Sequence, residues 1–425
     1  MAQTLDSVIL EMGRRARAAA RQLSILSSDT KNSILLRIAD VLVAETPAIL
    51  TANAEDIRLA EQRGLSSAMI DRLRLTEARI ASMASGIREV AALPDPVGKV
   101  ISTATRPNGL EIAKTRTPIG VVGIIYESRP NVTSDAAVLC LKTGNAVILR
   151  GGSEAIHSNL AIAAALEKGG RESGLPEYSV QVVPSTDRDA VRLIATMDLY
   201  VDVIVPRGGH ALIEAVVSQA RMPVIKHYHG VCHVYVDAKA DVDMAVKIAV
   251  NSKVQRPGVC NAMECLLVHT DIAEAFFAAA APAFREHGVA IRADQQALSH
   301  LATLGYEPLT EATEEDWSTE YLDKIMSVKE VSTLTEAVDH IETYGSHHSD
   351  SIVTADPVAA DRFLAEVDSA AVYWNASTRF TDGGEFGFGA EIGISTDKLH
   401  ARGPMGLEEL TTYKYIIRGN GQIRS

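Results

Sequence analysis

The sequence is short of cysteine and of positive charge. Its 425 residues include only four cysteines, which is too few for a disulfide framework and favours a reducing compartment. Acidic residues outnumber basic ones by 54 to 41, and the formal net charge is -13. Such a chain lacks the positive field that general binding to nucleic acid or to anionic membranes requires. We therefore expect neither partner, and an anionic substrate would need a local group of Arg and Lys side chains.

Long apolar segments are absent as well. The longest runs, such as residues 119–125, are far shorter than the roughly 20 residues of a membrane span. Residues 1–23 carry Glu11 and four arginines and contain no apolar segment followed by a cleavage site. A signal peptide is therefore not expected, and the chain is predicted to be cytoplasmic.

The usual nucleotide-binding motifs are missing too, because neither G-x-G-x-x-G nor G-x-x-x-x-G-K-[ST] occurs. Two other glycine turns follow strand-like runs and precede helical ones. Each would bring glycine backbone and a guanidinium to a helix N-terminus, where a phosphate can bind, although such turns are also ordinary connections. The candidate cofactor-binding residues in these turns are Arg150, Gly151, Gly152, Ser153, Arg207, Gly208 and Gly209.

What the sequence does have is a repeated strand and helix pattern. Helical spacing of apolar residues fills residues 4–93, and strands alternate with helices over residues 120–220 and again after residue 229. This alternation predicts an α/β fold with two parallel sheets, and the length is too great for one core. In the first sheet, the loops at the carboxyl ends of the strands should line a single crevice.

A hairpin interrupts the pattern between the N-terminal helices and the first parallel strand. Two alternating stretches, residues 100–105 and 110–116, flank Asn108-Gly109, and this pair is a strong hairpin signal. We expect residues 410–417 to add a strand and to complete an arm that pairs with another subunit, although a plain surface hairpin fits nearly as well. The predicted domains are 1–97 and 119–228 with 391–408, 229–390, and an arm of 98–118 with 409–425.

One cysteine stands at a place suited to chemistry. Cys260 lies in a polar turn just before the apolar run of residues 265–268, which predicts a buried strand. A thiol presented there can act as a nucleophile, and Lys253 and Arg256 would favour its thiolate. Cys265 lies inside the apolar run and is expected to be a buried hydrophobe, which is also the alternative for Cys260.

Other polar groups admit plainer interpretations. Residues 227–233 hold three histidines and a cysteine, but no second Cys/His cluster completes a zinc tetrahedron, so a linker is favoured and no metal is expected. His347-His348 is expected to be a solvated loop, and residues 298–317 an irregular acidic surface segment. Residues 375–380 follow a predicted strand, where they could hold a substrate carboxylate or amino group or form simple turns.

Several stretches resemble the aldehyde dehydrogenase superfamily. The superfamily resemblance rests on residues 117–123, 144–150 and the Cys260 turn, in that order and spacing. Residues 126–133, 375–384 and 399–407 are similar to one branch of it, the glutamate-5-semialdehyde dehydrogenases or γ-glutamyl phosphate reductases of proline biosynthesis. The resemblance extends to about Tyr415. It implies a cofactor-binding and a catalytic α/β domain, both with parallel sheets, and a small β oligomerisation arm.

The resemblance also implies roles for single residues. Cys260 would be the nucleophile, and Asn131 with the Cys260 N–H would form the oxyanion hole. Glu320 matches the glutamate that holds the nicotinamide ribose. Arg150 stands where the superfamily usually has a lysine at the cofactor ribose, and an arginine there suits a 2′-phosphate, so NADPH is expected. The candidate substrate contacts are Arg129, Lys253, Arg256, Ser377, Thr378 and Arg379.

The chain departs from the superfamily at His227. Hydrolytic members have a glutamate there that activates water, whereas this chain reads Lys-His-Tyr-His-Gly. A thioester without that base should survive to exchange with phosphate, which implies NADPH-dependent reduction of L-glutamyl 5-phosphate to L-glutamate 5-semialdehyde. The alternatives are a hydrolytic semialdehyde dehydrogenase, a cysteine acyltransferase without nicotinamide, and a non-catalytic scaffold. The expected partners are further copies of the chain, as a dimer or tetramer, and a glutamate 5-kinase.

Overall fold

The computed structural model describes residues 4–424 and divides into two compact units. Unit 1 consists of Met1–Lys226, Gly387–Gly393 and Met405–Ser425, and unit 2 of His227–Phe386 and Ile394–Pro404. Residues 1–3 and 425, which the sequence assigns to the first domain and the arm, lie outside the described residues. Among the described helices, none is both long enough and apolar enough to cross a membrane.

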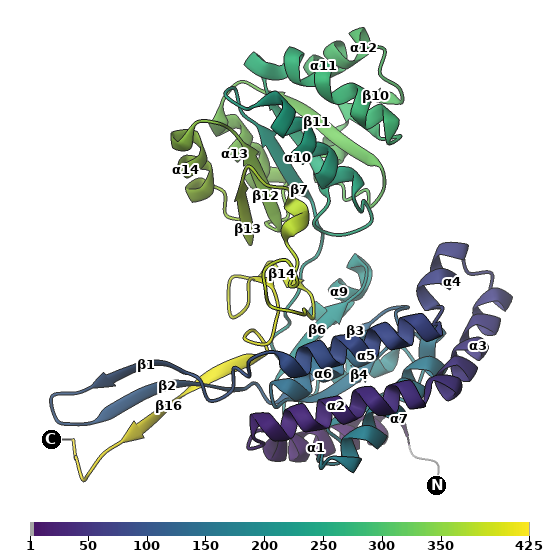
Figure 1. Cartoon of the computed structure of the whole chain (residues 1–425), viewed down its shortest axis with the longest axis vertical. Helices are drawn as coiled ribbons and strands as arrows, with labels where there is room; N and C mark the ends of the chain where they lie inside the picture. Colours follow the sequence, from purple (N-terminus) through teal and green to yellow (C-terminus); the bar gives the residue numbers. More distant parts are fainter. Residues whose placement is uncertain (1–3, 425) are drawn as a thin grey trace. The chain divides into compact units, whose positions relative to one another are not determined.

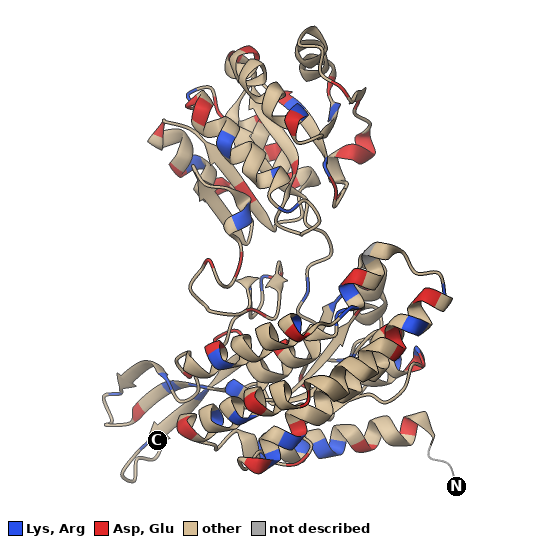
Figure 2. Ribbon diagram, turned by 45° about the vertical axis from the view of Figure 1, so that its right-hand side comes forward, with Lys and Arg blue, Asp and Glu red and all other residues tan. Residues whose placement is uncertain are grey.

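Unit 1 starts with five successive helices before its first strand, within the residues 4–93 that the sequence predicts to be helical. Side chains of Thr4, Ser27, Ser66 and Thr76 accept backbone N–H bonds at the starts of four of them. Figure 2 shows basic and acidic residues interspersed along these helices. The helices are α1 (Leu5–Leu23), α2 (Ser28–Ala44), α3 (Thr46–Gln62), α4 (Ser67–Leu73), α5 (Glu77–Ala92), α6 (Asn131–Lys142), α7 (Ile156–Glu172), α8 (Asp189–Ala195) and α9 (His210–Val217).

The sheet of unit 1 is parallel, as predicted, with strand order β5-β4-β3-β6. Helices α6 and α7 cover one face and carry α2 and α5 above them, while α1 packs on β4 (Figure 1). The central strands are entirely buried, which explains their unbroken apolar runs. The strands are β3 (Val121–Tyr126), β4 (Ala146–Arg150), β5 (Val180–Val182) and β6 (Val203–Arg207).

The hairpin of unit 1 forms a separate antiparallel sheet with the last strand of the chain. Its order is β1-β2-β16, with β1 (Val100–Thr105), β2 (Glu111–Pro118) and β16 (Thr411–Arg418) (Figure 1). Gly109 has a φ of +85° in the connecting turn, a conformation that favours glycine. The C-terminal run therefore adds a strand to the hairpin, as the sequence predicts, and pairing of this sheet with another subunit stays a prediction.

Unit 2 is built on a seven-stranded parallel sheet with order β10-β9-β11-β8-β7-β12-β13. Its strands are β7 (Cys232–Val236), β8 (Met263–His269), β9 (Ala290–Ala293), β10 (Leu309–Glu311), β11 (Ile325–Val331), β12 (Ser349–Val353) and β13 (Ala371–Trp374). Its helices are α10 (Val242–Val254), α11 (Thr270–Glu286), α12 (Gln295–Thr303), α13 (Leu334–Tyr344) and α14 (Pro357–Glu366). Short elements are η2 (Glu314–Ser318), η3 (Thr378–Phe380), β14 (Ile394–Ser395) and β15 (Gly403–Pro404).

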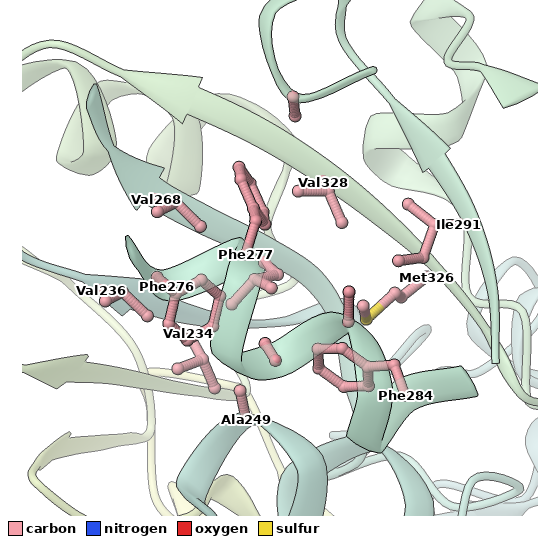
Figure 3. Close-up of a cluster of buried hydrophobic side chains, with 14 of the residues drawn as sticks. Val234, Val236, Ala249, Val268, Phe276, Phe277, Phe284, Ile291, Met326 and Val328 are labelled. Carbon is pink, nitrogen blue, oxygen red and sulfur yellow. The ribbon is translucent and has the colours of Figure 1, made fainter. Parts of the chain in front are cut away.

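Alternating residues of this sheet enter two different cores. Val234 and Val268 pack under α10, α11 and α12 with three phenylalanines of α11 (Figure 3). The neighbouring Tyr235 and Leu267 point to the opposite face, where they pack with residues of α13 and α14. Both faces of the sheet are therefore covered by helices and buried from water. Because side chains alternate between the two faces along a strand, a residue's position in the strand decides which core it joins.

Two sequence expectations in unit 2 are wrong. Residues 298–317 are not an irregular surface segment, because Leu301 and Trp317 are buried and Asp316 caps η2. His348 is not solvated, because its side chain is fully buried at the start of β12. In each case polar residues serve caps and interior hydrogen bonds that composition does not distinguish from solvated loops.

Candidate active site

Cys260 lies in the turn between α10 and β8, at the amino end of the parallel sheet of unit 2. It is half-buried, whereas the other three cysteines of the chain are fully buried. Burial raises the pKa of the Cys140 and Cys232 thiols, which makes both poor nucleophiles. Cys265 is buried as predicted. Cys260 is therefore the one cysteine whose sulfur a substrate can approach.

The main chain of Cys260 packs directly against Gly230. A Cβ atom on Gly230 would lie 2.0 Å from the Cys260 carbonyl oxygen and 2.5 Å from its Cα, so no larger residue fits. The Cys232 thiol also donates to this carbonyl oxygen, at 3.2 Å. The main chain of Cys260 is thus held in place by Gly230, just before β7, and by Cys232, the first residue of β7.

A run of hydrogen bonds extends from Cys232 along the amino edge of the sheet. Nδ1 of His348 lies 3.7 Å from the Cys232 sulfur and 2.9 Å from the Ser349 hydroxyl, which in turn lies 2.6 Å from the Thr381 hydroxyl. Burial, and secondarily the neighbouring His227, lowers the pKa of His348 to about 3. His348 is therefore a neutral link between β7, β12 and the segment that contains Thr381.

Asn261, the residue after Cys260, connects the Cys260 turn to residues 377–381 through hydrogen bonds. Its side-chain amide donates to the Thr381 carbonyl at 2.8 Å, and the Thr378 hydroxyl donates to the Asn261 carbonyl at 2.7 Å. The hydroxyls of Ser377 and Ser252 lie 2.9 Å apart. Ser377 and Thr378 are buried, so the structure supports a role in shaping the turn rather than direct contact with substrate. Sequence reasoning missed Asn261, although its place beside the candidate nucleophile was a usable signal.

Arg379 lies close enough to the Cys260 thiol and to Arg256 to interact electrostatically with both. Arg379 is half-buried and its Nε donates to the Gln255 side chain at 2.9 Å. Burial lowers the pKa of Arg379, the charge of Arg256 acts in the same direction, and the Cys260 thiol acts in the opposite one. Arg256 itself is exposed. A guanidinium group beside a thiol favours its thiolate and attracts anionic substrates. The sequence assigns the first role to Arg256 and Lys253 and anion contacts to Arg256 and Arg379, and these assignments stay predictions.

Lys253, unlike Arg256, is not accessible to solvent or substrate. It is fully buried, and its Nζ donates to Oε2 of Glu264 at 2.5 Å. The other oxygen of Glu264 accepts the Leu322 N–H at 3.2 Å. Burial lowers the pKa of Lys253 and raises that of Glu264. With no exposed surface, Lys253 anchors the end of α10 to β8, and its predicted contact with substrate has no support in the structure.

Glu320, predicted to hold the cofactor ribose, lies beside Gly230, the residue that packs on Cys260. Its Oε1 accepts the Gly230 N–H at 2.9 Å, and Gly230 in turn packs on Cys260. Burial raises the pKa of Glu320, and the Gly230 hydrogen bond acts in the opposite direction. Glu320, Gly230 and Cys260 therefore form a continuous contact within unit 2.

Arg150 lies at the carboxyl edge of the sheet of unit 1. It is buried, and its Nη1 donates to the Gly151 carbonyl at 2.9 Å. Its Nε is also buried and has no hydrogen-bond partner among the described residues. Burial lowers the pKa of Arg150, and the nearby guanidinium of Arg188, an exposed residue, also lowers it. Arg188 was not a sequence candidate, because it lies beyond the next strand, β5, just before α8, with no motif around it.

The two glycine turns at this edge already hold carboxylates of the protein. Oε2 of Glu127 accepts the Gly209 N–H at 3.0 Å, and a Cβ on Gly208 would lie 2.6 Å from the Glu127 carboxyl carbon. At the other turn, Glu154 accepts the Ser128 N–H at 3.1 Å and the Ser153 hydroxyl at 3.3 Å. A phosphate would have to displace Glu127 to reach the Gly209 N–H, and Glu154 to reach the Ser153 hydroxyl.

Asn131 begins α6 in unit 1 and is exposed. Its side-chain amide donates to Asp135 at 2.8 Å. Arg129, in the preceding loop, is exposed as well. Because Asn131 belongs to unit 1 and Cys260 to unit 2, their joint oxyanion hole stays a prediction.

The chain matches the aldehyde dehydrogenase family over residues 6–298, a range that includes the Cys260 turn. A gamma-glutamyl phosphate reductase of Moorella thermoacetica is 57% identical over 413 residues, which are 97% of each chain. The chain belongs to the gamma-glutamyl phosphate reductase branch of the aldehyde dehydrogenase family. The corresponding protein of Mesorhizobium japonicum is 53% identical over 99% of this chain and 97% of its own.

Solved structures confirm the predicted aldehyde dehydrogenase-like fold. The crystal structure of a gamma-glutamyl phosphate reductase from Thermotoga maritima matches with a TM-score of 0.95 at 45% identity, covering 98% of this chain and 100% of that one. An acetylating aldehyde dehydrogenase from Geobacillus thermoglucosidasius matches with a TM-score of 0.69 at 18% identity over 99% of this chain and 98% of that one. The second likeness concerns the fold alone.

Proposed function

We propose that this chain reduces L-glutamyl 5-phosphate to L-glutamate 5-semialdehyde and phosphate in proline biosynthesis, through a thioester on Cys260 and with NADPH as reductant. The observation that carries the proposal is the half-buried Cys260 with Arg379 within electrostatic reach of its thiol, in a chain 57% identical to a gamma-glutamyl phosphate reductase. It is the nucleophile and the anion-attracting group that an acyl phosphate needs.

The chemistry begins at the Cys260 sulfur. Its thiolate attacks the 5-carbonyl carbon, a C–S bond forms, and the C–O bond to phosphate breaks. The oxyanion formed on the way would accept hydrogen bonds from the Cys260 N–H and Asn131, each worth about 3 kcal/mol in comparable sites. Arg256 and Arg379 would hold the departing phosphate or the substrate's α-carboxylate. The thiohemiacetal left after reduction then expels the sulfur and releases the semialdehyde.

The residues of unit 1 fit a nicotinamide cofactor with a 2′-phosphate. Bound there, it supplies the hydride that reduces the thioester. The Nε of Arg150 is buried and has no hydrogen-bond partner within residues 4–424, and Arg188 adds an exposed guanidinium near it. Two arginines at the carboxyl edge of a parallel sheet suit the extra phosphate that distinguishes NADPH from NADH. We propose Glu320 as the contact of the nicotinamide ribose.

The Arg188→Ala substitution should weaken the binding of NADPH far more than the binding of NADH. Loss of one charge-assisted contact to the 2′-phosphate is expected to raise the KM for NADPH by about 10-fold or more, with little change for NADH. Steady-state kinetics with both cofactors measure this. Arg192→Ala is the matched control, because Arg192 lies one turn further on and is held by Asp189. An equal effect of Arg188→Ala on the two cofactors would contradict the assignment.

The reverse reaction should require phosphate. His227 stands where hydrolytic relatives would have a carboxylate, and its Nδ1 lies 2.8 Å from the Ile394 carbonyl. NADP reduction by glutamate 5-semialdehyde is therefore expected in phosphate buffer and not in a phosphate-free buffer of equal ionic strength. Sustained turnover without phosphate would favour a hydrolytic semialdehyde dehydrogenase.

We also propose that the arm pairs copies of this chain. Strand β1 is an edge of its sheet and is exposed along its whole length, and Tyr413, Tyr415 and Ile417 are exposed on β16. An exposed edge strand and exposed apolar side chains on the same sheet are typical of an interface formed by strand pairing. A glutamate 5-kinase partner in the cytoplasm fits the same function, because an acyl phosphate is labile in water.

A further inference from the structure

Three potential metal ligands meet in the interior of unit 2, apart from the Cys260 turn. Cys265 on β8 and His233 on β7 are direct partners in the parallel ladder, so their side chains point to the same face of the sheet. His340 comes from α13, which covers that face. The ligand atoms of these three residues lie within 4.8 Å of one another, and all three side chains are buried.

One measured spacing among these atoms matches zinc coordination. In a tetrahedral site with Zn–S of about 2.3 Å and Zn–N of about 2.0–2.1 Å, neighbouring sulfur and nitrogen ligands lie about 3.6 Å apart. Sγ of Cys265 lies 3.6 Å from Nε2 of His340. Nε2 of His233 is buried and has no hydrogen-bond partner among the described residues, which is costly unless the nitrogen binds something.

His233 is also held as metal-binding histidines usually are. Its Nδ1 lies 2.9 Å from Oδ1 of Asp350, the residue paired with it on β12. The same oxygen accepts the His233 backbone N–H at 2.8 Å, and Oδ2 accepts the Ser369 hydroxyl at 2.5 Å. A carboxylate on the far nitrogen fixes the imidazole with Nε2 available to a metal. Cys265, His233 and Asp350 thus form a row across three adjacent strands.

Charge balance is compatible with the same occupant. Two neutral imidazoles, one thiolate and the Asp350 carboxylate together carry two negative charges, which one Zn²⁺ would neutralise in a site removed from water. An ion bound by His340 as well would join α13 to the centre of the sheet. The three protein ligands would leave one position for a small ligand such as water.

We propose that His233, Cys265 and His340 bind a zinc ion that stabilises unit 2. The site is distinct from the catalytic thiol, since it uses the buried Cys265 and not Cys260. The sequence did not indicate it, because Cys265 and His340 are 75 residues apart and only His233 belongs to the histidine-rich stretch.

Metal analysis of the full-length protein, purified without chelators, tests the site. We expect about one zinc per chain in the wild type and less than about a tenth of that in Cys265→Ser and His340→Gln. Cys260→Ala, Cys140→Ala and the exposed His287→Gln are controls that should retain the metal. The Cys260→Ala control separates the proposed site from zinc captured by the catalytic thiol.

A second measurement does not depend on the variants folding. Wild-type protein stripped by a chelator should melt at a lower temperature and recover on addition of Zn²⁺, and Co²⁺ should give a thiolate charge-transfer absorption band. A wild type that holds no zinc and takes up neither ion would overturn the proposal. So would zinc retained at full occupancy in a folded Cys265→Ser protein.

Discussion

The Cys260→Ala variant is expected to lose turnover by roughly 10⁴-fold or more in both directions, since removal of a covalent nucleophile leaves only binding and electrostatic contributions. The other cysteines cannot replace it, because all three are fully buried. NADP reduction by the semialdehyde in phosphate buffer, followed at enzyme concentrations high enough to detect residual activity, measures the effect.

The fold should survive this substitution. Cys260 lies in a turn and is half-buried, so loss of its sulfur removes little buried apolar surface. Circular dichroism and the melting temperature should therefore match the wild type. Cys140→Ala, which removes a buried thiol in unit 1, should keep its activity. Turnover by Cys260→Ala within a factor of ten of the wild type would exclude Cys260 as the nucleophile.

The Gly230→Ala variant should be the most damaging change at a residue that carries no chemistry. Its Cβ would lie 2.0 Å from the Cys260 carbonyl oxygen, which is much less than van der Waals contact. The Cys260 turn must move, and a shift of about 1 Å at a nucleophile costs roughly 10²-fold in rate. The backbone rearrangement that the added Cβ forces should also lower the free energy of unfolding by about 1–3 kcal/mol.

The matched control for this prediction is Gly258→Ala in the same turn. A Cβ at Gly258 would meet only the Leu322 carbonyl oxygen, at 3.5 Å, which is ordinary contact. We expect kcat to fall in Gly230→Ala and to change little in Gly258→Ala. The rate at which iodoacetamide labels Cys260 should change in the first variant only. Equal kcat values for the two variants would show that the Gly230 contact does not position the nucleophile.

Periodicity was enough to predict the fold. The apolar runs that became β3 and β4 are buried on both faces, and strands alternate with helices over residues 120–220 as predicted. The arm was predictable because Asn108-Gly109 has one dominant use. The errors fell where polar residues are buried, as at Asp316 and His348, since composition alone cannot tell a capping or hydrogen-bonded residue from a solvated one.

The site was less predictable than the fold. Cys260 stands out because it precedes a strand, and Arg256 and Arg379 remain candidates for anion contacts in the structure. The burial of Lys253 could not be foreseen, because its partner Glu264 lies on the following strand and their pairing depends on how α10 ends. Gly230 was equally hidden, since only the folded chain brings it against the Cys260 carbonyl.

The most direct test of the central claim is a single-turnover reaction without phosphate, followed by mass analysis of the peptide that contains Cys260. Mixing the protein with glutamate 5-semialdehyde and NADP should form about one NADPH per chain and then stop, with a glutamyl group on Cys260 that added phosphate releases. Continued NADPH formation with Cys260 unmodified, or a glutamyl group on a different cysteine, would contradict the account.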